Sequence, residues 1–320
     1  MIELNLWSRI ANKVYIEILY RENIETFDEL FNALYWLHWE EYINTWTSIN
    51  VQVTTRDSKL TSEPTIQGIV KKAVIKTIAW DEHWKENPKR QLHIEIVLLK
   101  NRLQVLIDTS GESLSRRWYR TESGEAPLRE NIAAGIVLLS GWKFREALSD
   151  PFCGSGTILI EAALIARNIA PNLGRRFQFE HWKWTDKELL IELKKEARSK
   201  VFNKHFAIQG YDMDSEVIEK AKRNAERAGV ADTISFEVKK IEEARIENTW
   251  VITNPPYGIR LKEADIIHLH TELDKIFEQK DVSGGCITPF DLQSISRNKW
   301  KLRKLYNGWE KCNFYKKTLD

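Results

Sequence analysis

Apolar and polar residues alternate along several stretches of the first 110 residues. This alternation predicts four strands, at residues 13–20, 49–53, 92–98 and 103–107. Lys100 and Asn101 separate the last two strands and predict the turn of a β-hairpin. Thr26 and Glu29 have the spacing of a capping box and predict the start of a helix, and the apolar positions of residues 66–78 predict a second helix. Residues 1–110 are therefore expected to form an α+β domain.

From residue 127 the pattern changes to strands that alternate with helices. After a strand ending at Asp150, strands are predicted at residues 206–211, 234–238, 250–253 and 285–290. This alternation predicts an α/β fold with a mainly parallel sheet over residues 127–320. Two final strands joined by an Asn307–Gly308 turn predict a hairpin that adds an antiparallel strand. Residues 111–126 have no apolar stripe and are expected to form a linker.

The composition narrows the class of protein. Hydrophobic residues make up 42% of the 320 residues, enough for ordinary cores in two domains. The net charge of +2 means that any contact with nucleic acid must come from local basic patches. The three cysteines lack metal-ligand spacing and argue against a disulfide framework. No apolar run approaches the ~20 residues of a membrane helix, and the start lacks a signal peptide, so we expect a cytoplasmic protein without a metal or a membrane partner.

A glycine-rich loop follows the strand that ends at Asp150. It reads Asp-Pro-Phe-Cys-Gly-Ser-Gly-Thr over residues 150–157. Ligands of doubly wound sheets bind at such strand ends, and Gly154 and Gly156 let the backbone approach a ligand closely. A plain strand-to-helix turn is the alternative. Cys153 could act as a nucleophile in methylation of a pyrimidine carbon, but we favour a small packing residue.

The next predicted strand ends in Gly-Tyr-Asp-Met-Asp, residues 210–214. An acidic residue at this place can accept hydrogen bonds from ribose hydroxyls, and Asp212 is the candidate. The alternative is that Asp212 and Asp214 only cap the helix that begins near Ser215, which Asp214 favours in either case through the helix dipole.

A third motif, Asn254-Pro255-Pro256-Tyr257, directly follows the predicted strand 250–253. Two prolines with fixed φ make a stiff turn, which can aim the Asn254 amide oxygen and the Pro255 carbonyl into a cleft as acceptors. Two acceptors can position a poorly nucleophilic conjugated amine for attack on a methyl donor, and Tyr257 offers a ring on which a base can stack. A plain turn is the alternative for this motif alone.

A basic cluster surrounds two aromatic residues in the expected linker. Arg116, Arg117 and Arg120 flank Trp118 and Tyr119, an arrangement that suits contact with phosphates and bases. A solvated surface is the alternative. The residues expected to bind RNA are Arg116, Arg117, Tyr119 and Arg120, with Lys71 and Lys72 of the second predicted helix.

Taken together, the three motifs resemble those of the THUMP-domain RNA guanine-N2 methyltransferases. The bacterial branch that acts on large-subunit ribosomal RNA is the most similar. Leu6-Trp-Ser-Arg-Ile-Ala11, Asp108-Thr-Ser-Gly111 and Ala126-Pro-Leu-Arg-Glu130 also resemble family segments. The family usually has about fifty more residues at the start, a ferredoxin-like portion, and where it commonly has Arg-Gly-Tyr-Arg this chain has Arg-Trp-Tyr-Arg at residues 117–120.

The resemblance implies an RNA-binding THUMP domain over residues 1–110 and S-adenosylmethionine as cofactor. It also implies that residues 127–320 form a Rossmann-like class I methyltransferase domain with a mainly parallel, seven-stranded sheet. The implied cofactor-binding residues are Asp150, Pro151, Cys153, Gly154, Ser155, Gly156, Thr157, Asp212, Met213 and Lys240. Where many members have an Asp that grips the adenine, this chain has Lys239 and Lys240, so we expect adenine to be held by backbone atoms there or by Glu242. The target guanine amine would be held by Asn254, Pro255, Pro256 and Tyr257.

The resemblance implies transfer of a methyl group to guanine N2 of RNA, with 23S ribosomal RNA as the expected partner. A guanine of tRNA or an adenine of DNA is an alternative substrate with the same chemistry. A third hypothesis is a non-catalytic RNA-binding or ribosome-assembly factor that keeps a relic methyltransferase fold.

Overall fold

The computed structural model describes residues 1–43, 47–78, 91–120, 128–257 and 262–318. The chain forms two compact units. Unit 1 comprises residues 1–6, 12–113 and 175–194, and unit 2 comprises residues 7–11, 114–174 and 195–320. Among the described residues, no helix combines the length and the apolar character that crossing a membrane requires.

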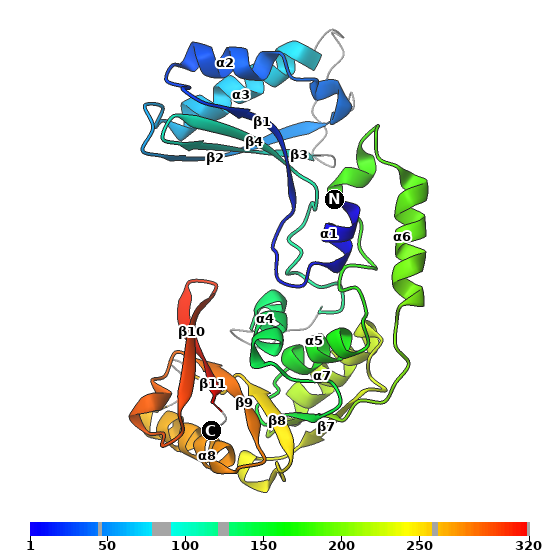
Figure 1. Ribbon diagram of the computed structural model, residues 1–320, viewed down its shortest axis with the longest axis vertical. Coiled ribbons are helices and arrows are strands. Elements are labelled where there is room, and N and C mark those ends of the chain that lie inside the picture. Colours follow the sequence, from blue (N-terminus) through cyan, green and yellow to red (C-terminus); the bar gives the residue numbers. More distant parts are fainter. Residues whose placement is uncertain (44–46, 79–90, 121–127, 258–261, 319–320) are drawn as a thin grey trace. The chain divides into compact units, whose positions relative to one another are not determined.

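Unit 1 contains a four-stranded sheet in the order β1-β4-β3-β2 (Figure 1). Its strands are β1 (Tyr15–Arg21), β2 (Ser48–Arg56), β3 (Gln91–Leu99) and β4 (Arg102–Asp108). β2 and β3 are parallel, and the other pairs are antiparallel. Helices α2 (Phe27–Tyr35) and α3 (Glu63–Ile78) lie together over one face of this sheet. A shorter helix, α1 (Ile2–Trp7), begins the chain.

The local signals in the sequence explain most of unit 1. Thr26 and Glu29 form the predicted capping box at the start of α2. Lys100 and Asn101 both have positive φ, at 53° and 60°, in the predicted hairpin turn. One detail of β1 differs from the expected alternation, because the register shifts between Glu17 and Leu19. Such a bulge turns the next side chain, so Leu19 rather than Ile18 is buried.

Unit 2 contains a seven-stranded sheet in the order β10-β11-β9-β8-β5-β6-β7, as predicted in class and strand number. Its strands are β5 (Ala147–Asp150), β6 (Ile208–Asp212), β7 (Ile234–Val238), β8 (Thr249–Thr253), β9 (Ser283–Thr288), β10 (Trp300–Asn307) and β11 (Glu310–Lys317). The strands from β5 to β9 are parallel, and the β10–β11 hairpin joins β9 in antiparallel fashion. The predicted α/β fold with a closing antiparallel hairpin is therefore confirmed.

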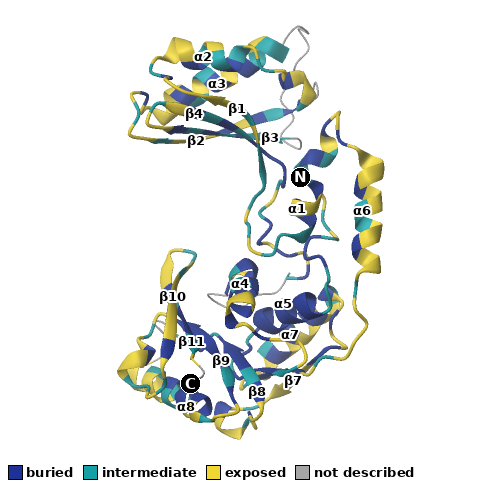
Figure 2. Cartoon of the chain, in the orientation of Figure 1, coloured by how far each residue is buried: buried dark blue, intermediate teal, exposed yellow. Residues whose placement is uncertain are grey.

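Helices cover both faces of this sheet. One core contains buried side chains of α4 (Glu130–Ser140), α5 (Thr157–Ala166) and α7 (Ser215–Ala228). The other contains α8 (Glu263–Glu278). Every residue of α5 is buried, and Figure 2 shows this helix in dark blue throughout. A remaining helix, α6 (Lys187–Ser199), is mostly exposed.

The compact units differ from the predicted division of the chain. Residues 7–11, expected in the first domain, pack with unit 2, and residues 111–113, expected in the linker, pack with unit 1. Residues 114–120, expected in a linker, pack with unit 2, where Leu114, Ser115, Arg117 and Tyr119 are buried. Residues 175–194, expected in the second domain, pack with unit 1. Residues 121–127 lie outside the described part of the chain.

Candidate active site at the carboxyl ends of β5, β6 and β8

Hydrogen bonds tie the three predicted motifs to one another. The Cys153 amide donates to the Tyr211 carbonyl over 2.9 Å, and the Gly154 amide donates to Asp212 Oδ2 over 3.0 Å. The Thr253 hydroxyl donates to Asp150 Oδ1. These contacts exist because β6 and β8 are the two parallel neighbours of β5, so the carboxyl ends of the three strands lie side by side at the same end of the sheet. The motifs therefore form one site, at the place where ligands of such sheets bind.

The glycine loop between β5 and α5 has a backbone that favours glycine at two positions. Gly154 has φ 53°, and space for a Cβ atom is open there. Gly156 has φ 82°, and a Cβ would lie 3.1 Å from Phe236 and 3.2 Å from Ala221. No side chain caps α5, which begins at Thr157. A loop with this backbone leads to the positive end of a helix, where a polar ligand can be held by amide groups.

Asp150 is a buried carboxyl at the end of β5. Its Oδ1 accepts hydrogen bonds from the Phe152 amide, over 3.0 Å, and from the Thr253 hydroxyl. Burial raises the pKa of Asp150 to about 7, against the opposing effect of these two donors. The carboxyl thus fixes the first turn of the loop and titrates near neutral pH.

Asp212 and Asp214 have different roles. Asp214 caps α7, because its Oδ1 accepts from the amides of Glu216 and Val217. Asp212 instead accepts from Gly154 of the loop and, over 3.0 Å, from the Asp214 amide. Burial raises the pKa of Asp212. The capping alternative is therefore correct for Asp214, while Asp212 joins the site; neighbouring Met213 is exposed.

The Asn254–Tyr257 turn continues directly from the buried end of β8. The amide oxygen of Asn254 is buried and has no hydrogen-bond donor among the described residues. Pro255 is buried, Pro256 is exposed and Tyr257 is half-buried. Burial raises the pKa of Tyr257 to about 12, with Asn307 and Cys312 beside its hydroxyl. A buried acceptor without a donor costs free energy, so Asn254 fits a ligand that brings an N–H group.

The structure supports the packing interpretation of Cys153. Its side chain is buried, and a Cβ at Gly210 would lie 3.1 Å from the Cys153 Cβ. Burial raises the pKa of the Cys153 thiol well above its usual value, so the reactive thiolate is disfavoured. The described residues contain no group of His, Cys, Asp and Glu side chains that could hold a metal ion.

The two lysines after β7, Lys239 and Lys240, have different surroundings and no shared binding partner among the described residues. Lys239 pairs with Glu237 over 2.7 Å, and its ammonium lies 5.5 Å from the centre of the Tyr211 ring. The Lys240 side chain is exposed, and its amide lies 3.4 Å from Glu243 Oε2. Glu242 lies 3.5 Å from His268. The expected role of Lys240 in cofactor binding stays a prediction about its backbone.

Burial corrects the predicted RNA contacts of Arg117 and Tyr119. Both side chains bind the buried Glu161 of α5: Arg117 Nε lies 3.1 Å and the Tyr119 hydroxyl 2.9 Å from Glu161 Oε1. Arg117 also donates to the carbonyl of Arg9 over 2.6 Å. A charged group inside a protein requires such partners, so these two residues serve the interior. In the sequence, Glu161 is the one charged residue of α5, which indicates a buried partner without identifying which residue that partner is.

Of the other four predicted RNA-binding residues, three are exposed and one is not. Arg116 is exposed, whereas Arg120 is largely buried, pairs with Glu130 over 3.3 Å and donates to the Leu128 carbonyl. Lys71 and Lys72 are exposed on α3 of unit 1. Their contact with RNA stays a prediction.

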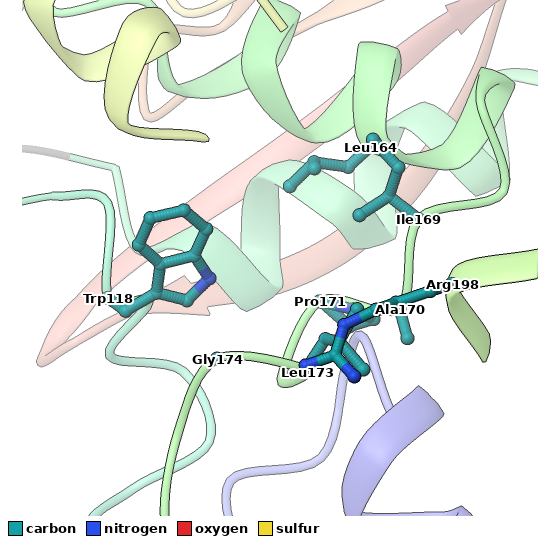
Figure 3. A pocket seen from close by; sticks show the side chains of 8 residues that line it. All are labelled: Trp118, Leu164, Ile169, Ala170, Pro171, Leu173, Gly174 and Arg198. Carbon is teal, nitrogen blue, oxygen red and sulfur yellow. The ribbon is translucent and has the colours of Figure 1, made fainter. Parts of the chain in front are cut away.

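A hollow of about 220 Å³ in unit 2 lies away from these motifs (Figure 3). Leu164 and Ile169 place it at the end of α5 opposite the glycine loop. Its lining is mainly apolar, with the exposed Trp118 ring and the Arg198 guanidinium at its sides. The candidate site is therefore defined by the hydrogen-bonded motifs and not by this hollow.

Known proteins resemble the chain over nearly its whole length. A Bacillus subtilis protein named putative RNA methyltransferase YpsC is 35% identical, covering 97% of this chain and 83% of that protein. The ribosomal RNA large subunit methyltransferase K/L of Shewanella baltica is 33% identical over 99% of this chain. This chain spans about half of that relative, 47% of its length.

A solved structure of a putative methyltransferase complexed with SAH (S-adenosylhomocysteine) superposes with a TM-score of 0.86 at 38% identity. The superposition covers 98% of this chain and 86% of that one. The ligand of that relative agrees with the cofactor predicted from the sequence, S-adenosylmethionine.

Two family matches account for the two parts of the chain. Residues 25–108 match the THUMP domain, and residues 117–312 match the family described as RMKL-like, methyltransferase domain. The second match covers more than half of the chain. With the fold, the joined motifs and the relatives above, it shows that the chain belongs to the RMKL-like methyltransferases and carries an amino-terminal THUMP domain.

Proposed function

We propose that the protein transfers a methyl group from S-adenosylmethionine to the exocyclic N2 amine of a guanine in RNA, most specifically in 23S ribosomal RNA. The observation that carries this proposal is the buried Asn254 amide oxygen, which no described donor satisfies. It follows β8, beside the loop held by Asp150 and Asp212. The relatives named for RNA and ribosomal RNA methyltransfer support RNA as substrate.

The residues of the loop fit the proposed cofactor. Gly154 leaves open space above the loop, and Asp212 holds the loop amide with a carboxylate that ribose hydroxyls can also reach. When bound, S-adenosylmethionine supplies an electrophilic methyl group on a positively charged sulfur. We assign cofactor binding to the loop, to Asp212 and to the backbone that leads from Val238 to Lys240.

The turn after β8 would act on the amine. Asn254 Oδ1 and the Pro255 carbonyl accept hydrogen bonds from its two N–H groups, and the ring of Tyr257 stacks on the guanine. Acceptors on both N–H groups increase the electron density of a nitrogen whose lone pair is delocalised. The nitrogen gains the methyl group and loses one proton, which leaves along the bond to an acceptor and passes to water. A base must leave any helix to enter such a site.

The two units would divide the work. We propose that unit 1, which contains the THUMP match, recognises RNA and that unit 2 performs the transfer. With ribosomal RNA as the proposed substrate, we expect this activity in the cytoplasm.

The test uses RNA from cells that lack the enzyme, incubated with purified protein and methyl-labelled S-adenosylmethionine. We expect incorporation that Asn254→Ala abolishes and that Asn203→Ala, at an exposed position, leaves intact. Mass spectrometry of the RNA nucleosides should show N2-methylguanosine. A parallel incubation with DNA that yields N6-methyladenosine, while the RNA stays unmethylated, would show that the proposed substrate is wrong. Cofactor binding in calorimetry without methylation of any RNA would instead contradict the proposal, and no cofactor binding would favour a relic fold.

A further inference from the structure

Positive charge is concentrated at the carboxyl end of the chain. Residues 297–317, which include β10 and β11, contain eight Lys and Arg residues and one acidic residue, Glu310. Their net charge is therefore +7, whereas the whole chain has +2, so the other 299 residues have a net charge of −5. A basic patch of this kind attracts polyanions.

The β10–β11 hairpin extends beyond the carboxyl ends of the parallel strands, which is the end of the sheet where the site lies. β11 pairs with β9 only from Asn313 onward, and Asn313 pairs with Thr288 at the carboxyl end of β9. Residues 310–312 and their β10 partners, residues 305–307, extend about 10 Å further at ~3.4 Å per residue. We call residues 305–312 the arm; Figure 1 shows it projecting from the sheet.

The arm touches the catalytic turn. Asn307 and Cys312 lie beside the hydroxyl of Tyr257. Asn307 Oδ1 also accepts from the Arg129 amide over 3.2 Å, at the start of α4. The arm is thus one wall of the place where the target amine would sit.

The turn of the arm differs from the predicted one, and the difference exposes a tryptophan. Asn307 pairs with Glu310, so the two central residues are Gly308 and Trp309, not Asn307 and Gly308. Gly308 has φ 69°, which a two-residue turn with glycine first requires. Trp309 consequently stands at the tip with its side chain fully exposed, and Tyr306 is 62% exposed.

The cations of β10 are free to bind a partner. Lys301, Arg303 and Lys304 are exposed on this strand, and Lys311 is exposed on β11. Figure 2 draws much of β10 in yellow, the colour of exposed residues. No carboxylate in the described part of the chain pairs with any of the four. β10 is an edge strand, and lysines on an edge can simply prevent sheet-to-sheet association. That role does not account for a bare tryptophan at the tip.

We propose that the arm and the exposed strand β10 bind the single-stranded nucleotides next to the target base. In this proposal, Trp309 and Tyr306 stack on bases, while Arg303 and Lys304 contact phosphates. Aromatic side chains within a basic groove are the usual means of holding single-stranded RNA. The inference rests on the proposed function, since it takes the Asn254–Tyr257 turn as the position of the target.

The test measures fluorescence anisotropy of a labelled, single-stranded 20-nucleotide RNA with the full chain. The pair Arg303→Ala/Lys304→Ala is compared with Lys143→Ala/Arg145→Ala. The second pair also removes one Lys and one Arg beside an exposed aromatic residue, Phe144. It directly precedes β5, so it lies near the amino ends of the parallel strands, at the opposite end of the sheet from the site. The β10 pair, Arg303→Ala/Lys304→Ala, should lower the slope of log K against log salt by about 1.4, and the control pair should leave it unchanged.

Trp309→Ala should weaken RNA binding at least about five-fold, because stacking on one base is worth ~1 kcal/mol or more. Trp309→Phe should restore most of the affinity. Thermal unfolding confirms that each variant is folded. Equal RNA binding by the β10 pair and the control pair overturns the inference, and protection of the sheet edge remains as the role of the cations. If the two pairs bind RNA equally and the wild-type protein still methylates RNA, the proposed function stands and only this inference is wrong. If the arm and β10 bind RNA but the protein methylates no RNA, the proposed function is wrong and this inference stands.

Discussion

Replacing Asp150 with asparagine should change how the stability of the protein depends on pH. The Asp150 side chain is 1% exposed, and burial raises its pKa to about 7. In the unfolded chain the value is about 3.9. Between these two values the native state holds a proton that the unfolded state has lost, so the free energy of unfolding decreases as pH rises from about 4 to about 7 and is constant above.

The size of the effect follows from the two pKa values. Each unit corresponds to about 1.4 kcal/mol, so a difference of about 3 units removes roughly 4 kcal/mol by neutral pH. Asparagine cannot ionise. Both donors to the carboxyl, Phe152 and Thr253, reach Oδ1, so an amide oxygen in that place can keep both bonds. The variant should therefore lose the slope while keeping the turn.

The assay is urea unfolding of wild type and Asp150→Asn at pH 5, 6, 7 and 8, followed by tryptophan fluorescence. The difference between the two proteins isolates Asp150, because the unfolding of unit 1 contributes equally to both. That difference should shift by about 2 kcal/mol in favour of the variant between pH 5 and 7. The hydrogen bond from Thr253 lowers the pKa of Asp150. Thr253→Val removes this bond, so the pKa of Asp150 should rise and the upper end of the slope should move to higher pH. A difference that is constant over the whole range would show that the hydrogen bonds outweigh burial and would refute the reasoning.

Three more changes test the site and its support. Gly156→Ala and Gly229→Ala both place alanine at positive φ, which should lower the free energy of unfolding by about 1–2 kcal/mol each. Only the alanine at Gly156 would meet another atom, at 3.1 Å. In calorimetry, therefore, only Gly156→Ala should also weaken binding of S-adenosylmethionine. Asp212→Ala should weaken that binding about ten-fold or more, by loss of a charged acceptor; unchanged affinity would remove Asp212 from the site. Arg117→Met should destabilise the protein by about 3–5 kcal/mol in urea unfolding because Glu161 stays buried and charged, and Glu161→Leu added to it should recover most of the loss.

Sequence periodicity was sufficient for the fold because each strand and helix has its own apolar pattern. The site was predictable for a related reason: each motif directly follows a strand, and parallel strands bring their carboxyl ends together. The contacts between the motifs, such as that from Gly154 to Asp212, confirm the grouping but could not be derived from spacing. The roles of the individual residues in binding stay predictions.

Side chains whose partners lie far along the chain were beyond the reach of the pattern. Arg117 and Tyr119 look like surface residues in a polar stretch, and only the position of Glu161, 44 residues after Arg117, shows that they are buried. The predicted position of the hairpin turn near Gly308 was wrong for a different reason. Asn-Gly and Gly-Trp can both occupy a two-residue turn, and the pairing of β11 with β9 decides the register.

The amino-terminal segment completes the catalytic unit through the far end of α5. Arg9 Nη2 donates to the carbonyls of Leu164 and Ile169, over 3.3 and 2.8 Å, at the carboxyl end of the helix, where a cation also interacts favourably with the helix dipole. Arg117 in turn bonds to the Arg9 carbonyl and to Glu161 in the middle of the same helix. The glycine loop precedes α5, so the helix is held at its loop end through Asp212 and at its other end by residues 7–11. A chain beginning at residue 127 would keep every motif of the site yet leave Glu161 buried without Arg117 and Tyr119, so the catalytic unit depends on segments that precede all of its motifs.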